Sequence, residues 1–267
     1  MGFLLVRLSS NEGVKLAEFL SNFIRKFVSF VPKNNSNMKE KDQENAEYSG
    51  SRVSNYINKN TLKNVFFFSG GIILFISGVI GYGIILNLRT VPINELMAEK
   101  GIKAIDHPVI IVDRKEYSLS LYDDTTLIKT YRAYFGRNVQ IVKSRYGDLA
   151  TPVGVYKICA IDSAYKYDKF FKLNYPNISD ISEGLKKGVI TQQQFDNMKD
   201  ELNHNGCPGS VTVLGGNIGI HGLGRLNFLL KNLPFVYNWT DGSVAISNEG
   251  IEEIYPLVKK GTKVVIK

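Results

Sequence analysis

The chain has 267 residues, of which 44% are hydrophobic and 22% charged. These values are ordinary for a folded protein, and the length allows one sizeable domain plus accessory segments. The formal net charge of +8 is divided evenly, with +4 in residues 1–64 and +4 in the remainder. Neither part has the dense basic stripe of a nucleic-acid-binding protein, so no nucleic-acid partner is expected.

Residues 1–31 predict an amphipathic helix, with Ser9 and Glu12 at capping-box spacing. Such a helix either lies on a membrane surface or packs on another surface, and both interpretations are open. Pro32 ends it, and residues 32–64 are polar and weakly periodic, which predicts a disordered linker. The apolar side chains of the helix expected at residues 1–31 recur every three or four residues: Leu16, Phe19, Leu20, Phe23, Phe27 and Phe30.

Residues 65–88 predict a transmembrane helix. From Val65 to Leu86 the chain carries no charge, and at ~1.5 Å per residue this run spans ~33 Å, enough for the hydrocarbon core of a bilayer. The basic residues on its two sides are balanced, but the preceding segment is short, and long domains cross regardless of charge. We therefore expect a single-pass membrane anchor, with the N-terminal segment in the cytoplasm and residues 89–267 exported, of which residues 89–107 form a linker.

Residues 108–267 predict a mainly β domain, a β-sandwich or closed sheet with short helices. Strands are expected at residues 109–112, 117–122, 127–135, 155–160, 211–214, 218–220 and 262–267, separated by turn residues. Short helices are expected after Ser179 or Asp180, from Thr191 to about Asn203, and after Ser247.

The candidate site lies between residues 217 and 248. An apolar run delivers His221 onto Gly222, and Ser243 follows Gly242 in a tight Asp-Gly segment. A base, a hydroxyl and glycine turns at strand ends are typical of an acyl-transfer site. The two cysteines, Cys159 and Cys207, are too few for a disulfide framework, so one bond and two free thiols are both open.

Five blocks in this region resemble the L,D-transpeptidase catalytic domain of the YkuD type, in the branch with a W-T-x-G-C site. They are I-V-D-R-K-E-Y-S-L-S-L-Y (111–122), G-D-L-A-T-P-V-G-V-Y-K-I (147–158), L-N-Y-P-N (173–177), I-G-I-H-G (218–222), and N-W-T-D-G-S-V-A-I-S-N-E (238–249) with G-T-K-V-V-I (261–266). The resemblance implies acyl transfer on peptidoglycan stem peptides in the cell envelope, without metal or organic cofactor. The acceptor is an amine of a second stem peptide, an envelope protein or, in hydrolytic relatives, water.

The resemblance also implies residue roles. His221 matches the histidine of the I-x-I-H-G block and is the expected base. Gly242 keeps the backbone close to the reacting carbonyl, and the N–H groups of residues 242–243 are the expected oxyanion donors. Trp239 and Thr240 match the W-T of the loop and are expected to line the pocket. Arg225, either a carboxylate-binding residue or a solvated loop arginine, lies four residues past His221.

Ser243 departs from the family pattern, in which this position is the nucleophilic cysteine. A hydroxyl is far less acidic than a thiol, so a lone histidine activates it poorly. Three interpretations are open: an engineered substitution, a natural serine with residual activity, and a non-catalytic descendant that still binds wall peptide. Asp241 either orients His221 in a Ser-His-Asp arrangement or belongs to an ordinary turn. The scattered His107, His204 and cysteines have no metal-ligand spacing.

Overall fold

The computed structural model describes residues 59–87, 90–209 and 211–267. The chain divides into two compact units at the boundary between Gly78 and Val79. The expected amphipathic helix at residues 1–31 and most of the expected linker at residues 32–64 lie outside the described residues.

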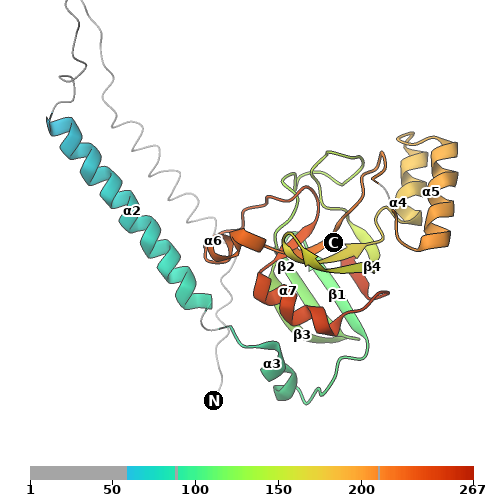
Figure 1. Ribbon diagram of the computed structural model, residues 1–267, viewed down its shortest axis with the longest axis horizontal. Helices are drawn as coiled ribbons and strands as arrows, with labels where there is room; N and C mark the ends of the chain where they lie inside the picture. Colours follow the sequence, from blue (N-terminus) through green and yellow to red (C-terminus); the bar gives the residue numbers. More distant parts are fainter. Residues whose placement is uncertain (1–58, 88–89, 210) are drawn as a thin grey trace, which may run out of the picture. The chain divides into compact units, whose positions relative to one another are not determined.

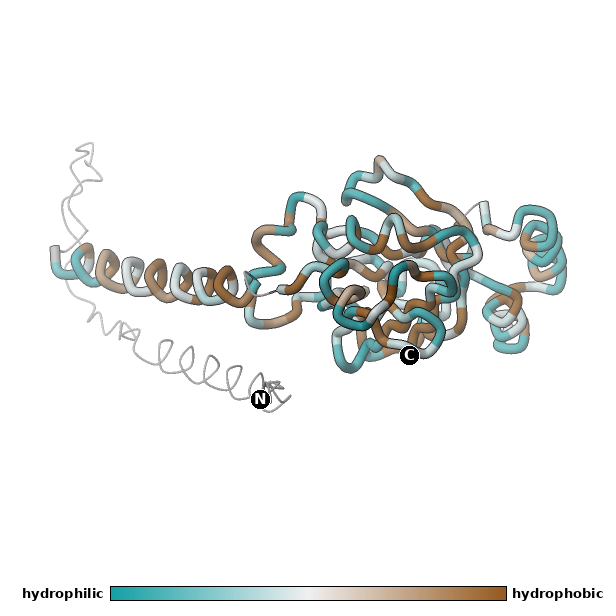
Figure 2. Tube along the Cα trace, turned by 90° about the horizontal axis from the view of Figure 1, so that it is seen from below, coloured by the Kyte–Doolittle hydropathy of each residue, from teal (hydrophilic) through white to brown (hydrophobic). Residues whose placement is uncertain are grey.

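Helix α2 (Lys59–Asn87) contains the uncharged run. It begins six residues before Val65, so the last part of the expected polar linker is helical. Apolar residues follow one another along most of it, as the brown segments in Figure 2 show, with an 18-residue window of mean hydropathy 2.0. By length and composition α2 is a candidate membrane span.

Eight strands form the second unit's sheet, in the order β3-β2-β1-β8-β4-β5-β6-β7. The pairs β1–β8 and β6–β7 are parallel and the others antiparallel. The strands are β1 (Pro108–Asp113), β2 (Ser118–Asp123), β3 (Thr126–Arg132), β4 (Gly154–Tyr165), β5 (Asp168–Leu173), β6 (Gly219–Gly222), β7 (Val244–Ile246) and β8 (Lys263–Ile266).

The sheet closes on itself just after β3. The N–H of Tyr134 donates to the carbonyl of Ala245 at 2.8 Å, and the N–H of Ala245 donates back at 2.8 Å. Strand β4 pairs with β8 along its first residues and with β5 along its later ones, so it belongs to both halves of the sheet. The expected sheet-rich fold with short helices is therefore confirmed, and of the two forms that the sequence left open, a β-sandwich or a closed sheet, the strands form one sheet that closes.

Alternation along the strands builds the core. In β1 every second residue is buried, with Ile110 and Val112 at 0% exposure, because successive side chains point to opposite faces of a sheet. Helix α3 (Ile93–Glu99) adds Ile93 and Met97 to this core. The segment expected to be a linker at residues 89–107 thus contains a packed helix.

The chain between β5 and β6 forms a separate helical pair, α4 (Ile178–Lys186) and α5 (Gln192–Asn205), at one end of the domain (Figure 1). Asn177, rather than Ser179 or Asp180, caps α4, and Asp180 completes its capping box. Thr191 and Gln194 form the expected second box. The pair has its own small core, formed by Ile181, Ile190 and Leu214 with partly buried neighbours.

Residues 211–214 do not form the expected strand. Thr212 instead bonds to Gly215 in a tight turn, through its N–H at 2.9 Å and its hydroxyl at 2.8 Å. Gly215 has φ +105, which favours glycine. After β6 the chain forms η1 (Gly224–Leu226) and α6 (Asn227–Lys231), and after β7 it forms α7 (Asn248–Ile254), capped by Ser247, and η2 (Tyr255–Leu257).

Cys159 and Cys207 form a disulfide bond with a Cα–Cα distance of 5.3 Å. Cys159 lies in β4 and Cys207 in the loop that follows α5. The bond settles the alternative that the sequence left open, and it ties the chain after the helical pair to the sheet. Disulfides persist in oxidising compartments, so the bond is consistent with an exported domain.

Replacing both cysteines by alanine should lower the free energy of unfolding. The bond closes a segment with a sequence separation of 48, for which chain entropy gives a stabilisation of about 4 kcal/mol. Urea unfolding of the unreduced wild type, the reduced wild type and the double alanine variant measures this. Two reactive thiols in the unreduced, unfolded protein would contradict the bond.

Candidate active site

A pocket of about 560 Å³ opens where β6, the loop before β7 and the β4–β5 turn come together. It contains both halves of the site that the sequence predicted, His221 and Ser243. Segments from four parts of the chain line it: Arg137, Lys143, Tyr146, Gly147 and Leu149; Tyr165, Lys166 and Tyr167; Val211, Gly215, Gly216, Asn217, Ile218 and His221; and Trp239, Thr240, Asp241 and Ser243.

The parallel pairing of β6 with β7 brings the two halves together. Ile220 lies opposite Val244 and His221 opposite Ala245. One position earlier, the N–H of Gly219 donates to Oγ of Ser243 at 3.2 Å. Residue 243 therefore sits at the start of the strand beside the histidine, although 22 positions separate the two along the chain.

His221 is buried, with 3% exposure, and its Nδ1 lies 2.6 Å from the carbonyl oxygen of Gly222. A carbonyl only accepts, so we assign the proton to Nδ1, which leaves Nε2 as an acceptor. Burial lowers the pKa of His221 from 6.5 to about 4; the charge of Lys166 lowers it further and the Gly222 bond opposes the shift. The imidazole is neutral at pH 7, as a general base must be.

Aromatic rings surround the imidazole. Tyr167 stacks on it with a centroid distance of 5.0 Å, and Trp239 meets it edge-on at 5.8 Å. Tyr165 lies at 6.0 Å. The two tyrosines belong to the β4–β5 turn and Trp239 to the loop before β7. This environment removes water from the histidine and accounts for the direction of its pKa shift.

The loop before β7 is held by Thr240 and Gly242. The hydroxyl of Thr240 donates to the carbonyl of Ser243 at 2.6 Å and accepts from the N–H of Gly242 at 3.3 Å. Gly242 is buried with φ +129, and a Cβ there would lie 2.7 Å from the carbonyl oxygen of Ala150. Only glycine fits this conformation and this contact. The Gly242 N–H, one of the two expected oxyanion donors, thus already has a partner in the loop.

Asp241 lies at the pocket but does not orient the histidine. Its carboxylate forms an ion pair with Arg137, and its side chain is 78% exposed. The bond to Gly222 takes the Nδ1 position that an orienting carboxylate would need. The imidazole is therefore held by a backbone carbonyl rather than by the carboxylate of Asp241.

Arg225, the expected carboxylate-binding residue, is exposed in η1 and is not among the residues that line the pocket. The pocket's basic side chains are instead Arg137, Lys143 and Lys166, which the sequence analysis did not single out. The sequence offered a weak sign for Lys166 alone, because Tyr165 and Tyr167 alternate around it as residues of a strand do.

The three cations differ in their partners. Lys143 is buried against Asp148, with Nζ 2.8 Å from the carboxylate. Burial opposes ionisation of Asp148, but Lys143 and three backbone N–H groups lower its pKa overall. Lys166 has no carboxylate partner among the described residues, and its Nζ lies 4.8 Å from the ring centroid of Tyr167. Its positive charge is therefore available to an anionic ligand.

Comparison with known proteins agrees with this geometry. The sequence model of the YkuD family, described as the L,D-transpeptidase catalytic domain, matches residues 107–266. The chain belongs to this family. A comparison with curated proteins finds no match.

A comparison with solved structures finds, among others, two L,D-transpeptidases and a cell shape determining protein. That of Xylanimonas cellulosilytica is 12% identical with TM-score 0.36, covering 66% of this chain and 70% of its own. The helical cell shape determining protein Pgp2 of Campylobacter jejuni is 20% identical with TM-score 0.38, covering 66% and 55%. The L,D-transpeptidase of Mycobacterium smegmatis is 13% identical with TM-score 0.34, covering 60% and 58%. This chain therefore spans little more than half of the last two.

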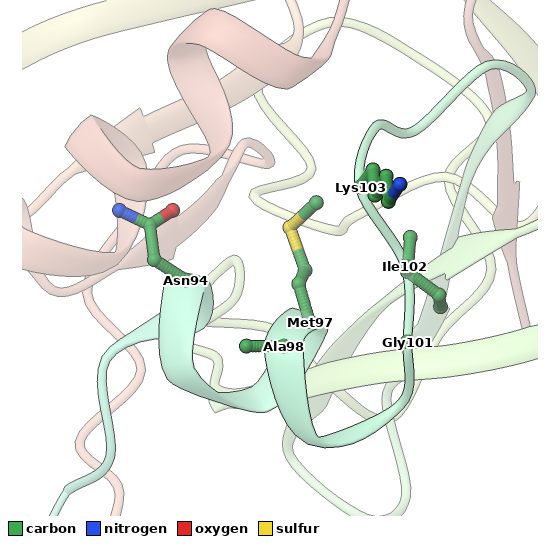
Figure 3. A pocket seen from close by; sticks show the side chains of 6 residues that line it. All are labelled: Asn94, Met97, Ala98, Gly101, Ile102 and Lys103. Carbon is green, nitrogen blue, oxygen red and sulfur yellow. The ribbon is translucent and has the colours of Figure 1, made fainter.

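This member of the L,D-transpeptidase family has a second hollow, formed by α3 and the turn after it (Figure 3). It is lined by Asn94, Met97, Ala98, Gly101, Ile102 and Lys103. These six residues include no acid, histidine or hydroxyl, so they offer no acyl-transfer chemistry. Across the residues that the structure describes, no group of three or more His, Cys, Asp or Glu side chains is arranged to hold a metal ion.

The lowered pKa of His221 predicts a pH-dependent stability. Between about 4 and 6.5 the unfolded histidine binds a proton that the folded one does not. The contribution of His221 to the free energy of unfolding should therefore be fully present above about pH 6.5. It should be lost as the pH drops toward 4, which lowers the free energy of unfolding by up to about 3 kcal/mol.

Urea unfolding of the detergent-solubilised protein across this pH range measures the effect. The matched control is His221→Gln, which keeps a polar side chain of similar size but does not titrate. An equal pH dependence in the wild type and this variant would show that His221 is not the titrating group.

Proposed function

We propose that this domain transfers acyl groups of peptidoglycan stem peptides through residue 243, with His221 as the base. The observation that carries the proposal is the shared pocket. It holds a neutral imidazole, whose Nδ1 is bonded to a carbonyl, beside a residue that can carry a nucleophile. Membership of the L,D-transpeptidase family supports the substrate class.

In the first half-reaction the side-chain oxygen or sulfur of residue 243 attacks the carbonyl of an L-centre–D-centre peptide bond, and its proton passes to Nε2 of His221. The N–H of Ser243 is the oxyanion donor that we assign, because the N–H of Gly242 is bonded to Thr240. Collapse of the resulting tetrahedral intermediate breaks the peptide bond and expels the terminal D-amino acid, whose amine takes the proton from Nε2. The acyl group is then bound to residue 243.

In the second half-reaction an amine or water attacks the acyl-enzyme and gives its proton to Nε2. The leaving oxygen or sulfur of residue 243 regains a proton from the imidazolium, so the enzyme returns to its starting state. The candidate amines belong to a second stem peptide or to an envelope protein. Trp239 and Thr240 form the wall against which the donor peptide lies.

Ser243 makes the chain as it stands a slow enzyme in this scheme. Its hydroxyl accepts from Gly219, and His221 has a backbone carbonyl rather than a carboxylate as its partner. A neutral carbonyl stabilises an imidazolium less than a carboxylate does. A thiol, with pKa ~8.5, needs less help.

The hydrogen bond from Gly219 to Ser243 favours a second candidate function, a module that binds stem peptide without chemistry. The pocket and its cations remain, while Oγ of Ser243 is engaged by the backbone N–H of Gly219. Direct binding of muropeptide without an acyl adduct would select this function. An acyl group found on Ser243 itself would exclude it.

The domain is expected to work on the outer side of the membrane, anchored by α2 at the predicted span of residues 65–88. Peptidoglycan lies outside the cytoplasm, and the disulfide between Cys159 and Cys207 is stable there. Protease digestion of the domain in intact protoplasts or spheroplasts tests this orientation, since a cytoplasmic domain would be protected.

Ser243→Cys should give the clearest gain of activity. We expect a stable adduct with a carbapenem and release of the terminal D-amino acid from a tetrapeptide muropeptide, both absent or much slower with Ser243. Mass spectrometry of the intact protein measures the first and chromatography of the muropeptide the second. Adding His221→Gln should reduce the rate by about 10²–10⁴-fold. A cysteine form without adduct or product would refute the proposed chemistry.

Lys166 should attract the carboxylates of the donor peptide. In the Ser243→Cys background, Lys166→Met should raise KM by about 5- to 10-fold, equivalent to about 1 kcal/mol of charge attraction, with little change in kcat. Lys166→Arg keeps the charge and should restore KM. The effect should shrink at high salt and with a donor whose carboxylates are amidated. An equal KM for the Met and Arg variants would argue against this role.

A further inference from the structure

An uncovered apolar surface lies on the segment between β6 and the active-site loop. Over η1, α6 and the following loop, five large apolar side chains are exposed; we call this set the apolar patch. Its members are Leu226 at 42%, Phe228 at 63%, Leu229 at 47%, Phe235 at 50% and Tyr237 at 58%. Single exposed apolar residues are normal, but five within twelve positions, three of them aromatic, are characteristic of an interaction surface.

The inner side of the same segment is firmly attached. Leu230 is buried at 4% exposure in a small core with Tyr134 and Ala245. The hydroxyl of Tyr134 donates to the Leu230 carbonyl at 2.8 Å, and the guanidinium of Arg132 donates to the Leu233 carbonyl at 2.6 Å. The apolar patch is thus the outer face of a segment whose inner face, through Leu230, is packed on the domain.

The chain from α2 joins the domain beside this segment. Nζ of Lys129 on β3 donates to the carbonyl of Val91 at 2.8 Å, and Ile93 is buried in the core. Lys129 and Arg132 are three residues apart on β3, about 10 Å along the strand. More directly, the side chain of Asn87, the last residue of α2, donates to the carbonyl of Lys231 at 3.1 Å and to Oδ1 of Asn232 at 2.7 Å, so the chain from α2 enters the domain beside α6.

The connection from α2 is short. Six residues lead from Asn87, the last of α2, to Ile93, and a fully extended chain of this length reaches about 20 Å. If α2 spans a bilayer, the side of the domain that carries Val91 must stay close to the lipid headgroups. Residues 223–240 suit such a surface, because they contain the basic Arg225 and Lys231 and no acidic residue, although Lys231 is paired with Glu249.

We infer that the apolar patch rests in the interfacial region of the bilayer that α2 spans, with Phe228 and Phe235 in the acyl-chain boundary and Tyr237 at headgroup depth. Aromatic and apolar side chains on a fixed amphipathic segment favour this location. Two positions after Tyr237, Trp239 lines the active-site pocket. The contact therefore holds one wall of the pocket at a set height above the membrane. The inference rests on the membrane anchoring within the proposed function.

Spin labels on the full-length protein in proteoliposomes test it. Both native cysteines are bonded to each other, so a label reacts with an introduced cysteine at Phe228→Cys or Phe235→Cys. The matched control is Val155→Cys in β4, which is 57% exposed and is separated from β3 by three strands in the sheet order. Near-ultraviolet circular dichroism confirms that each variant is folded.

The rate at which the spin label collides with oxygen reports its exposure to lipid, and the rate at which it collides with a water-soluble nickel complex reports its exposure to solvent. Labels at positions 228 and 235 should have an oxygen-to-nickel collision ratio several-fold above that at position 155. Ratios equal to the control would overturn the inference, and so would shielding that occurs only after a membrane protein extract is added, which would assign a protein partner. The readout does not involve residue 243, so failed acyl transfer and failed membrane contact remain distinguishable.

Discussion

The parallel pairing of β6 with β7 is the interaction on which the site depends. It places His221 opposite Ala245, and the N–H of Gly219 reaches Ser243 one step earlier. The pairing is itself supported on the far side, because the chain after β3 bonds to Ala245 in both directions. A four-residue and a three-residue strand could not hold this register alone, and closure of the sheet supplies what their length lacks.

The environment of His221 combines two requirements that oppose each other. Burial among aromatic rings keeps the imidazole neutral and therefore able to accept a proton. The same burial disfavours the imidazolium that the proposed acyl transfer requires, and the Gly222 carbonyl offsets only part of that cost. A nucleophile that ionises readily suits such a base, which is why the identity of residue 243 matters more here than in a site with an orienting carboxylate.

Much of the fold could be predicted from alternation and capping. The strands at β1, β2 and β8, the Thr191–Gln194 box and the Ser247 cap all follow from local chemistry. Strand β5 was missed because Phe170 and Phe171 are both buried, which hides the period of two. Helix α3 was missed because its seven residues read as linker until Ile93 and Met97 pack on the core.

The site divides in the same way. His221, Ser243, Trp239 and Thr240 share a pocket as their motifs predicted, because those motifs lie on neighbouring strands. For Arg225 and Asp241 the sequence left two alternatives each, and the structure shows Arg225 outside the pocket lining and Asp241 paired with Arg137. The role of Arg225 was inferred from its spacing to His221 and that of Asp241 from its side-chain type. Spacing and side-chain type do not give the direction of the chain after a turn or the ion-pair partner of a carboxylate. The pocket's cations, Arg137, Lys143 and Lys166, lie 77 or more positions before residue 243, so placing them at the site required the tertiary structure.

The bond between Cys159 and Cys207 has a practical consequence for anyone producing the protein. Four residues after Cys207 the chain reaches Val211 and begins to form a pocket wall. Material made in a reducing cytoplasm lacks this covalent link, so that wall is held by non-covalent contacts alone. Samples purified from the cytosol and from an oxidising secretion route therefore differ covalently close to one wall of the pocket, and ligand titrations of the two should be compared only after their thiol content has been measured.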